Sequence, residues 1–308
     1  MTGVPDRRSP GTERLRRSLH FVPGASEKML HKSLATAADG LVLDLEDAVT
    51  PQNKSAARQT VAAWLRDVDF RGKERTVRMN ALDTPWGLDD IAAVMAHPPD
   101  AFVVPKVSNL AQLERIDAEI GRLEAAYGHP AGSVGLILVA TETPLGVLNL
   151  ATFPQCLRVI AMNWGAEDLS ATLGAARNRR PDGSYLDTYR YARVQTLLAA
   201  AAGGVQALDA VHVDIRDLDD LQTECREGAW MGFTGKITIH PDQIDIVNAA
   251  FTPSPEEIAE AERLVAAMAD AERDGLMAIA FEGRMVDVPH LSRARRILDR
   301  ARQTGAAS

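Results

Sequence analysis

The segment GLILVATETP, residues Gly135–Pro144, decides the fold of this 308-residue chain. Its first six residues are all apolar, and the polar residues Thr141, Glu142 and Thr143 follow them directly. A short run that is apolar on both faces is typical of a strand in a parallel sheet whose two faces are covered. The segment therefore predicts a buried strand, Gly135–Ala140, that ends next to a carboxylate.

Seven similar runs flank this strand, and helix-like stretches lie between them. Eight strand–helix units in about 240 residues match the usual size of an α/β (β/α)₈ TIM barrel. An open, doubly wound parallel sheet is the structural alternative. The other predicted strands are Ser18–Val22, Gly40–Leu43, Arg75–Met79, Ala101–Val104, Arg158–Met162, Ala207–Val213 and Lys236–Ile239. The predicted helices include Glu27–Ala38, Ser55–Arg66, Leu110–Tyr127 and Tyr189–Ala202.

Three parts follow from this pattern. We expect a flexible N-terminal arm over residues 1–16, a barrel domain that carries the catalytic site over 17–251, and a C-terminal extension or lid over 252–308. The extension begins with a capping box, in which Ser254 is the N-cap and Glu257 closes the box. A hairpin and a final basic helix are predicted after it, at Ala278–Phe281, Arg284–Val288 and Ser292–Arg302.

Composition excludes several classes of protein. The net charge of −8 argues against nucleic acid as the main partner, because a phosphate backbone requires a basic face. The chain shows no apolar run of membrane-spanning length and no signal peptide. Its two cysteines, Cys156 and Cys225, have no metal-ligand spacing. We therefore expect a cytoplasmic protein without a disulfide framework.

Acidic residues follow several of the predicted strands. In a parallel barrel all the strand ends emerge on the face that carries the active site. Oxygen ligands without nearby His or Cys favour Mg²⁺, with Mn²⁺ as the alternative ion. Asp44 and Asp47 also stand where a carboxylate would cap a helix, and spacing alone does not select two ligands from the group. The five acids are Asp44, Glu46, Asp47, Glu142 and Asp168.

Basic residues stand at the same strand ends. Arg78 is a candidate fork for a substrate carboxylate, or a partner for the acids. Lys106 is interpreted as charge compensation in preference to a Schiff-base nucleophile. Lys28 and Lys32 lie four residues apart on one helix face, where they either bind phosphates or remain solvated. His240 is either a ligand contact or a structural group.

These blocks resemble the citrate lyase β-subunit-like family, within the HpcH/HpaI aldolase and citrate lyase superfamily. The resemblance extends from about Arg17 to His290, and the blocks stand in the family's order. They are RSLHFVPG (Arg17–Gly24), LDLEDAV (Leu43–Val49), VRMN (Val77–Asn80), VPK (Val104–Lys106), ETPLG (Glu142–Gly146), GAEDL (Gly165–Leu169), GFTGK (Gly232–Lys236) and IHPDQ (Ile239–Gln243).

The resemblance implies a barrel with a C-terminal extension and an assembly of three or six chains, a homotrimer or a hexamer. It implies Mg²⁺-dependent cleavage or formation of a carbon–carbon bond in a 3-hydroxyacyl thioester such as malyl-, methylmalyl- or citramalyl-CoA. The partners would be an acyl-CoA thioester and a 2-oxo acid. The metal ligands fall on Glu142 and Asp168, Arg78 falls on the substrate-carboxylate position, and Glu46 and Asp47 become supporting catalytic residues.

The resemblance also implies contacts with the thioester. Coenzyme A would touch Phe21, Lys28 and Lys32, although a Tyr can stand at the first of these positions. Further substrate contacts are expected at Ile239 and His240. The segment Arg284–Asp287 resembles a lid motif whose Asp enters the site of a neighbouring subunit. Asp287 would then be the catalytic acid/base, although the residues alone indicate an ordinary hairpin position.

Three other functions share these features. The first is the β-subunit of a citrate lyase complex acting on a citryl-acyl carrier protein. The second is a malyl-CoA thioesterase using the same site, and the third is a scaffold without activity. The Lys28 and Lys32 pair and the long C-terminal lid favour a freestanding enzyme for coenzyme A thioesters.

Overall fold

The computed structural model describes residues 14–306, and these divide into two compact units with the boundary between Asn248 and Ala249. Most of the predicted arm lies outside the described residues. Arg16, which was expected in the arm, is fully buried, and its guanidinium donates two hydrogen bonds of 2.6 and 2.7 Å to Glu74. Arg16 is therefore bound to the barrel before the first strand begins.

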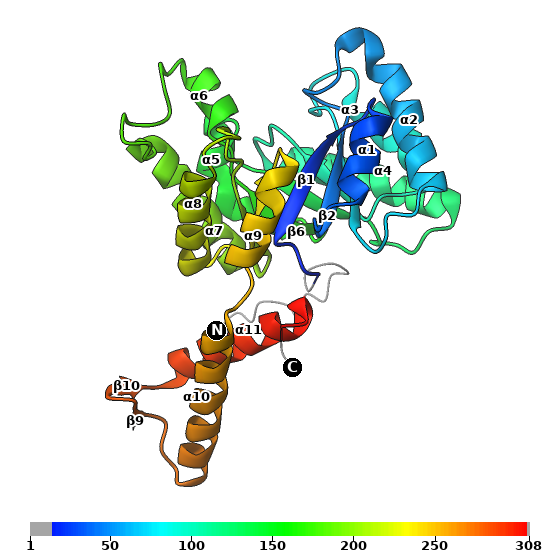
Figure 1. Ribbon diagram of the computed structural model, residues 1–308. Coiled ribbons are helices and arrows are strands. Elements are labelled where there is room, and N and C mark those ends of the chain that lie inside the picture. Colours follow the sequence, from blue (N-terminus) through cyan, green and yellow to red (C-terminus); the bar gives the residue numbers. More distant parts are fainter. Residues whose placement is uncertain (1–13, 307–308) are drawn as a thin grey trace. The chain divides into compact units, whose positions relative to one another are not determined.

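The first unit is a closed barrel of eight parallel strands, with each strand bonded to the next and β1 bonded to β8 (Figure 1). This result confirms the predicted (β/α)₈ TIM barrel. The strands are β1 (Ser18–Pro23), β2 (Gly40–Asp44), β3 (Glu74–Arg78), β4 (Ala101–Val104), β5 (Gly135–Val139), β6 (Val159–Asn163), β7 (Gln206–Asp209) and β8 (Gly235–Thr238).

Helices follow the strands and cover the barrel. Short 3₁₀ helices interrupt the connections at η1 (Pro51–Asn53), η2 (Leu150–Gln155) and η3 (Pro241–Gln243). The α-helices of this part are α1 (Glu27–Leu34), α2 (Lys54–Asp67), α3 (Gly87–Val94), α4 (Leu110–Tyr127), α5 (Pro144–Asn149), α6 (Glu167–Leu173), α7 (Asp187–Gly203), α8 (Leu218–Met231) and α9 (Ile244–Ala250).

Apolar side chains from the strands pack together as one core cluster. Burial of this surface is the main force that holds the strands together. The cluster consists of Leu19, Val42, Ala101, Val103, Ile137, Val139, Ile160, Ala161, Leu208 and Ile237. The predicted strands are apolar on both faces because a barrel strand is covered on its inner face by this core and on its outer face by helices.

The predicted strands lie within one or two residues of the observed ones, except at the seventh. The expected strand extended to Val213, whereas β7 ends at Asp209. The Asp209 carboxylate accepts hydrogen bonds from Ala210 N and from the Trp164 indole, and the chain leaves the sheet there. The apolar residues beyond it therefore belong to a loop that β8 does not pair.

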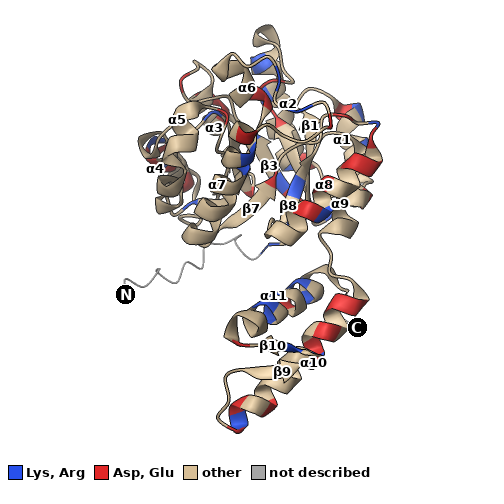
Figure 2. Ribbon diagram, turned by 90° about the vertical axis from the view of Figure 1, so that its left-hand side faces the viewer, with Lys and Arg blue, Asp and Glu red and all other residues tan. Residues whose placement is uncertain are grey.

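The second unit contains α10 (Pro255–Arg273), a two-stranded antiparallel sheet of β9 (Ile279–Phe281) and β10 (Arg284–Val286), and α11 (Val288–Thr304). Ser254 caps α10 and exchanges hydrogen bonds with Glu257, as the sequence predicted. Figure 2 shows acidic residues on α10 and basic residues on α11. The unit has an apolar core of its own, made of Ala261, Leu264, Met268, Phe281, Val286 and Ala294.

Within residues 14–306, no helix is both long enough and apolar enough to cross a membrane.

One buried titratable group makes the stability of the barrel depend on pH. His20 on β1 is 1% exposed, and its Nδ1 lies 3.0 Å from the Thr238 hydroxyl. Burial, together with the charge of His240, lowers the pKa of His20 from 6.5 to about 4. The unfolded chain therefore binds a proton in a pH range where the folded barrel does not. The contribution of His20 to the free energy of unfolding is therefore fully present above pH 6.5 and is lost as the pH falls toward 4.

We predict that the wild type loses about 2 kcal/mol more unfolding free energy between pH 7 and pH 5 than His20→Asn, which cannot titrate. The measurement is urea unfolding followed by circular dichroism at both pH values. Equal losses for the two proteins would show that His20 does not carry this pH dependence.

Candidate active site

The register of β2 against β3 places Asp44 beside Arg78 at the ends of the two strands. Arg78 donates from Nε and Nη2 to the two Asp44 oxygens, each at 2.7 Å. The same carboxylate accepts from the backbone N–H groups of Glu46 and Ala48. Asp44 therefore anchors Arg78 and also shapes the loop that carries the next acids.

Phe21 on β1 lies against the other side of the arginine. The Arg78 guanidinium carbon is 4.6 Å from the centre of the Phe21 ring. Such a stacked arrangement is favourable for a planar cation. The Arg78 fork is thus fixed by a bidentate carboxylate and by an aromatic face.

Glu46 bridges the two cations of the site. Its Oε2 lies 2.9 Å from Arg78 Nη1, and its Oε1 accepts a 2.5 Å hydrogen bond from Lys106 Nζ. Burial raises the pKa of Glu46 in spite of these partners. Asp47 is 58% exposed and lies farther from them, at 3.5 Å from Arg78 and 3.7 Å from Lys106.

Lys106 follows β4 with a φ of +53°. A left-handed backbone costs a residue other than glycine about 1–2 kcal/mol. This conformation accompanies a 2.6 Å hydrogen bond from its backbone N–H to Glu142 Oε2. The hydrogen bond to Glu46 and the charges of Asp47 and Glu142 raise the pKa of Lys106 above its usual value, although burial opposes them. The amine is therefore protonated, in agreement with charge compensation rather than a Schiff base.

Glu142 follows β5 and is only 5% exposed. Burial first, and then the charges of Glu46 and Asp168, raise its pKa to about 8. The next residue, Thr143, caps α5. Gly146 lies so close to backbone oxygens that an added Cβ would be 2.4 Å from Val107 O. This close approach explains the ETPLG motif, because only glycine lets α5 start directly behind the carboxylate.

Asp168 stands in the first turn of α6 and is 38% exposed at its side chain. Its Oδ1 lies 3.7 Å from Lys106 Nζ, and its charge contributes to the raised pKa of Glu142. The structure therefore brings the two predicted metal ligands to one end of the barrel. Glu142 is the buried member of the pair, and Asp168 is the more accessible one.

A cavity of about 670 Å³ opens beside Glu46, Asp47 and Lys106, along the loops that follow β2 and β3. Its lining also includes Trp86. Lys54, also on the wall, donates to the carbonyls of Leu45 and Glu46 and lies 5.3 Å from the Trp86 ring centre. Glu46 and Asp47 thus line a space of ligand size.

The remaining predicted residues have the following local surroundings. Lys28 and Lys32 are exposed on α1. Ile239 and His240 follow β8, where the His240 ring accepts from Asp242 N and caps η3. Asp287 lies in the second unit at the start of α11, 2.6 Å from His290 Nδ1.

The sequence reasoning missed how several polar residues are used. Buried Gln243 receives hydrogen bonds from Ile239 N and His240 N and donates to His212 O, so that it joins the ends of β7 and β8. A capping box between His240 and Gln243 is the signal that could have revealed this role. Asn163 and Trp164 follow one another at the end of β6 and are bonded to the chain around Asp209.

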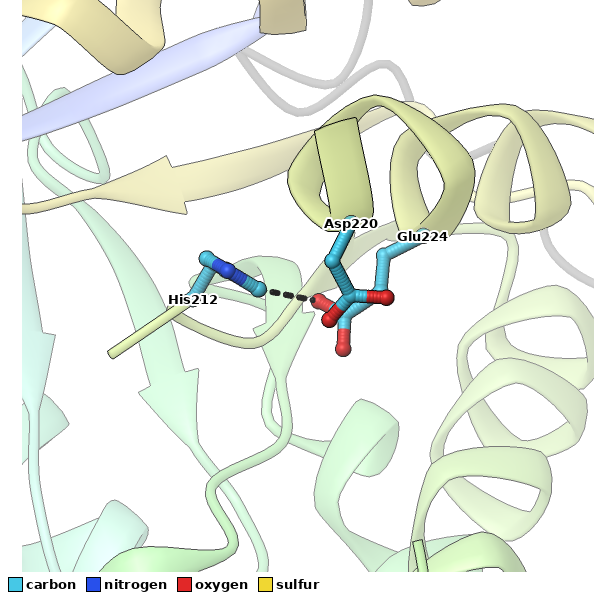
Figure 3. Close-up of side chains that lie close together, drawn as sticks. All are labelled: His212, Asp220 and Glu224. Atoms are coloured by element: carbon cyan, nitrogen blue, oxygen red, sulfur yellow. Dashed lines mark hydrogen bonds and ion pairs between the residues drawn. The ribbon is translucent and has the colours of Figure 1, made fainter. Parts of the chain in front are cut away.

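A second polar cluster joins the loop after β7 to α8. Figure 3 shows His212 bonded to Glu224, with Asp220 alongside. Their ligand atoms lie within 4.8 Å of one another. Lys236 and Arg179 already lie 3.3 and 2.6 Å from Glu224. With His212, they lower the pKa of this carboxyl despite its burial. This cluster is balanced internally and does not need a metal ion.

At the site at the end of the barrel, by contrast, the carboxylates outnumber the basic groups. Five carboxylates, Asp44, Glu46, Asp47, Glu142 and Asp168, outnumber the cations Arg78, Lys106 and the nearby Lys54. Crowded acids favour an additional positive charge. Carboxylate oxygens are the ligands that Mg²⁺ and Mn²⁺ prefer. The donor set therefore fits a divalent cation held by oxygen atoms.

Comparison with known proteins agrees with this geometry. Residues 17–241 match the HpcH/HpaI aldolase/citrate lyase family. Citrate lyase subunit beta of Escherichia coli K12 is 38% identical over 293 residues, or 95% of each chain. The (3S)-malyl-CoA thioesterase of Cereibacter sphaeroides strain KD131 is 37% identical over 290 residues, which cover 94% of this chain and 96% of that protein.

Among solved structures, protein CitE from Mycobacterium tuberculosis, in complex with magnesium, acetoacetate and coenzyme A, matches with a TM-score of 0.77. It is 36% identical, and the match covers 95% of this chain and 99% of that one. The barrel, the order of its motifs and these relatives lead to one conclusion. The chain belongs to the HpcH/HpaI aldolase/citrate lyase family and is an enzyme of that family.

Proposed function

We propose that this enzyme cleaves or forms a carbon–carbon bond in a 3-hydroxyacyl-CoA thioester such as malyl-, methylmalyl- or citramalyl-CoA. The products of cleavage would be acetyl- or propionyl-CoA and a 2-oxo acid. The observation that carries this proposal is the buried Glu142 beside Asp168, with the anchored Arg78 fork at the same end of the barrel. The Mycobacterium tuberculosis relative, solved with magnesium, acetoacetate and coenzyme A, supports it.

Glu142 and Asp168 would hold the metal ion, which we propose is Mg²⁺, with Mn²⁺ as the alternative. When bound, the ion supplies a Lewis acid that withdraws electrons from the oxygens of the substrate. Glu142 is suited to this role because the backbone N–H of Lys106 fixes one of its oxygens. Glu46 would act as a supporting residue that holds Arg78 and Lys106 in place, with the more exposed Asp47 at the edge of the same group.

Arg78 would bind the carboxylate of the 2-oxo acid and stabilise negative charge that develops on oxygen. The charges of Asp44, Glu46 and Asp47 raise its pKa far above the usual value although burial opposes this, so the guanidinium stays charged. Asp44 uses two of its five N–H donors, and Nη1 faces Glu46 and Asp47, so the second N–H of Nη2 would remain for a ligand. Phe21 would keep the fork in plane beneath the substrate.

Coenzyme A would be held by Lys28 and Lys32, whose exposed ammonium groups follow β1 on α1 and suit phosphates. We propose contacts of the acyl part with Ile239 and His240 at the end of β8. The acid/base would be Asp287 from a neighbouring subunit. Cleavage of the carbon–carbon bond would leave an enolate on the acyl-CoA fragment, and Asp287 would protonate its carbon. Closure of the lid would exclude water from that carbon. Because His290 Nδ1 is 2.6 Å from its carboxylate, this histidine would orient the acid.

The proposed assembly is a homotrimer or hexamer. Helix α7 carries Tyr191, Val194 and Leu198 at spacings that share one helix face, and all three are exposed. An exposed apolar stripe of this kind is typical of a contact surface. The free, buried cysteines Cys156 and Cys225 fit a reducing compartment, and we propose the cytoplasm as the location.

Two related functions remain as alternatives. The Escherichia coli relative favours action as the β-subunit of a citrate lyase complex on a citryl-acyl carrier protein. The Cereibacter sphaeroides relative favours hydrolysis of malyl-CoA at the same site. The three reactions release different products from the same kind of thioester, which makes them separable in one assay.

Malyl-CoA, citramalyl-CoA and a citryl-acyl carrier protein are the test substrates for the reaction. We expect acetyl-CoA and glyoxylate from malyl-CoA, and acetyl-CoA and pyruvate from citramalyl-CoA, measured by chromatography over time. Free malate with free coenzyme A as the first products would favour the thioesterase. Turnover of the citryl-acyl carrier protein alone would favour the citrate lyase subunit.

Substitution of the metal ligands tests the ion. Glu142→Gln and Asp168→Asn each remove one charge with little change of shape, and we expect at least about 100-fold lower kcat/KM together with weaker Mg²⁺ binding. Isothermal calorimetry with MgCl₂ gives the binding and a coupled assay gives the rate. Glu167→Gln is the matched control, because it removes a neighbouring charge at the start of the same helix as Asp168. Unchanged Mg²⁺ affinity in both variants would contradict the metal assignment.

Mixed oligomers test the lid. Arg78→Ala and Asp287→Asn should each abolish turnover, because one lacks the carboxylate fork and the other the acid. If Asp287 serves a neighbouring subunit, an equal mixture refolded together forms some sites with both residues intact. About one quarter of wild-type activity is then expected, since each residue is intact in half of the chains. A mixture with no activity would place both residues in the same chain's site.

A further inference from the structure

The side chain of Lys106 lies among the acids of the site instead of pointing to solvent. Its Nζ is 2.5 Å from Glu46 Oε1 and 3.7 Å from both Asp47 Oδ1 and Asp168 Oδ1. Its backbone N–H donates to Glu142. One residue therefore contacts one of the two proposed metal ligands through its backbone and reaches the other with its ammonium group.

The backbone of Lys106 holds it in this place. Its φ of +53° is a conformation that favours glycine, and in residues 14–306 it is shared only with Arg71 and Glu282 among residues other than glycine. Strain at such a site is tolerated where the surrounding contacts determine the conformation. The contact with Glu142 is made by the backbone, so a change of side chain leaves it available.

Charge explains why an ammonium is favoured here. Asp44 and Glu46 face Arg78, whereas no ion pair within residues 14–306 joins an arginine to Glu142 or Asp168. Lys106 is the cation that reaches toward this second pair. A single positive charge in this position relieves the repulsion between the acids, in the same way as a bound ion would.

We propose that the Lys106 ammonium is an internal counter-ion that competes with the divalent cation, so that metal loading at Glu142 and Asp168 exchanges one positive charge for another. This inference rests on the proposed function, which assigns the metal to those two carboxylates. The ammonium lowers the metal affinity by repulsion, and it keeps the acid cluster folded before the metal arrives. Its 2.5 Å contact with Glu46 does not involve either of the proposed metal ligands.

The experiment measures metal affinity directly. Full-length wild type, Lys106→Met and Lys106→Gln are stripped with EDTA, dialysed and titrated with MgCl₂ by isothermal calorimetry. Removal of a charge this close should lower the Kd for Mg²⁺ about tenfold or more in both variants. Lys106→Gln can still donate a hydrogen bond to Glu46, which keeps the test available if Lys106→Met does not fold.

Two controls separate local charge from other effects. Lys106→Arg keeps the charge and should bind Mg²⁺ with an affinity like that of the wild type. Arg66→Met removes an exposed charge from the last turn of α2, outside the site, and should also leave the affinity unchanged. The proposed exchange is wrong if the wild type binds Mg²⁺ and both uncharged variants bind it with the same or a lower affinity. Binding by none of the proteins would overturn the metal assignment itself.

Thermal unfolding gives a second readout that does not use activity. In EDTA, Lys106→Met should melt at a lower temperature than Lys106→Arg, because its acids lack the internal cation. Saturating MgCl₂ should raise the Tm of Lys106→Met by more than that of Lys106→Arg, since ligand stabilisation grows with affinity. The same Mg²⁺ shift in both variants would contradict the proposal.

Discussion

The bidentate pair between Asp44 and Arg78 is the interaction on which the rest of the site depends. It is fixed by the register of β2 and β3, and Asp44 is almost fully buried. The same carboxylate binds the backbone of the following loop and so places Glu46 between Arg78 and Lys106. Removal of one partner from a buried pair leaves an uncompensated charge, so this geometry is strongly constrained.

The excess of acids over bases then determines the electrostatics. Arg78 and Lys106 are held protonated by the carboxylates around them, whereas Glu142 has a pKa of about 8 because it is buried beside other acids. The polar cluster of His212, Glu224 and Lys236 shows the other solution, in which internal cations balance a buried acid. The difference between the two clusters is the physical reason why ion binding is proposed at one of them only.

Much of the fold was predictable, because the relevant signals are local. Helix α4 begins and ends at the predicted residues, since Asn109 and Gln112 form a capping box and Gly128 ends the helix with a positive φ. The apolar runs predicted the strands, and the polar residues at the ends of those runs predicted that the acids and Arg78 gather at one end of the barrel. The end of β7 was placed wrongly because Val211 and Val213 are apolar but lie in a loop that is held by buried side chains.

The sequence by itself determined the barrel, the capped start of α10 and the residues that gather at one end, because periodicity and capping act over a few neighbouring residues. Only the tertiary structure decided which acid meets which base. Asp44 and Arg78 are 34 positions apart, and Lys106 and Glu46 are 60 apart. Strand register and the left-handed backbone at Lys106 bring these groups together, and neither is encoded in the spacing of the motifs.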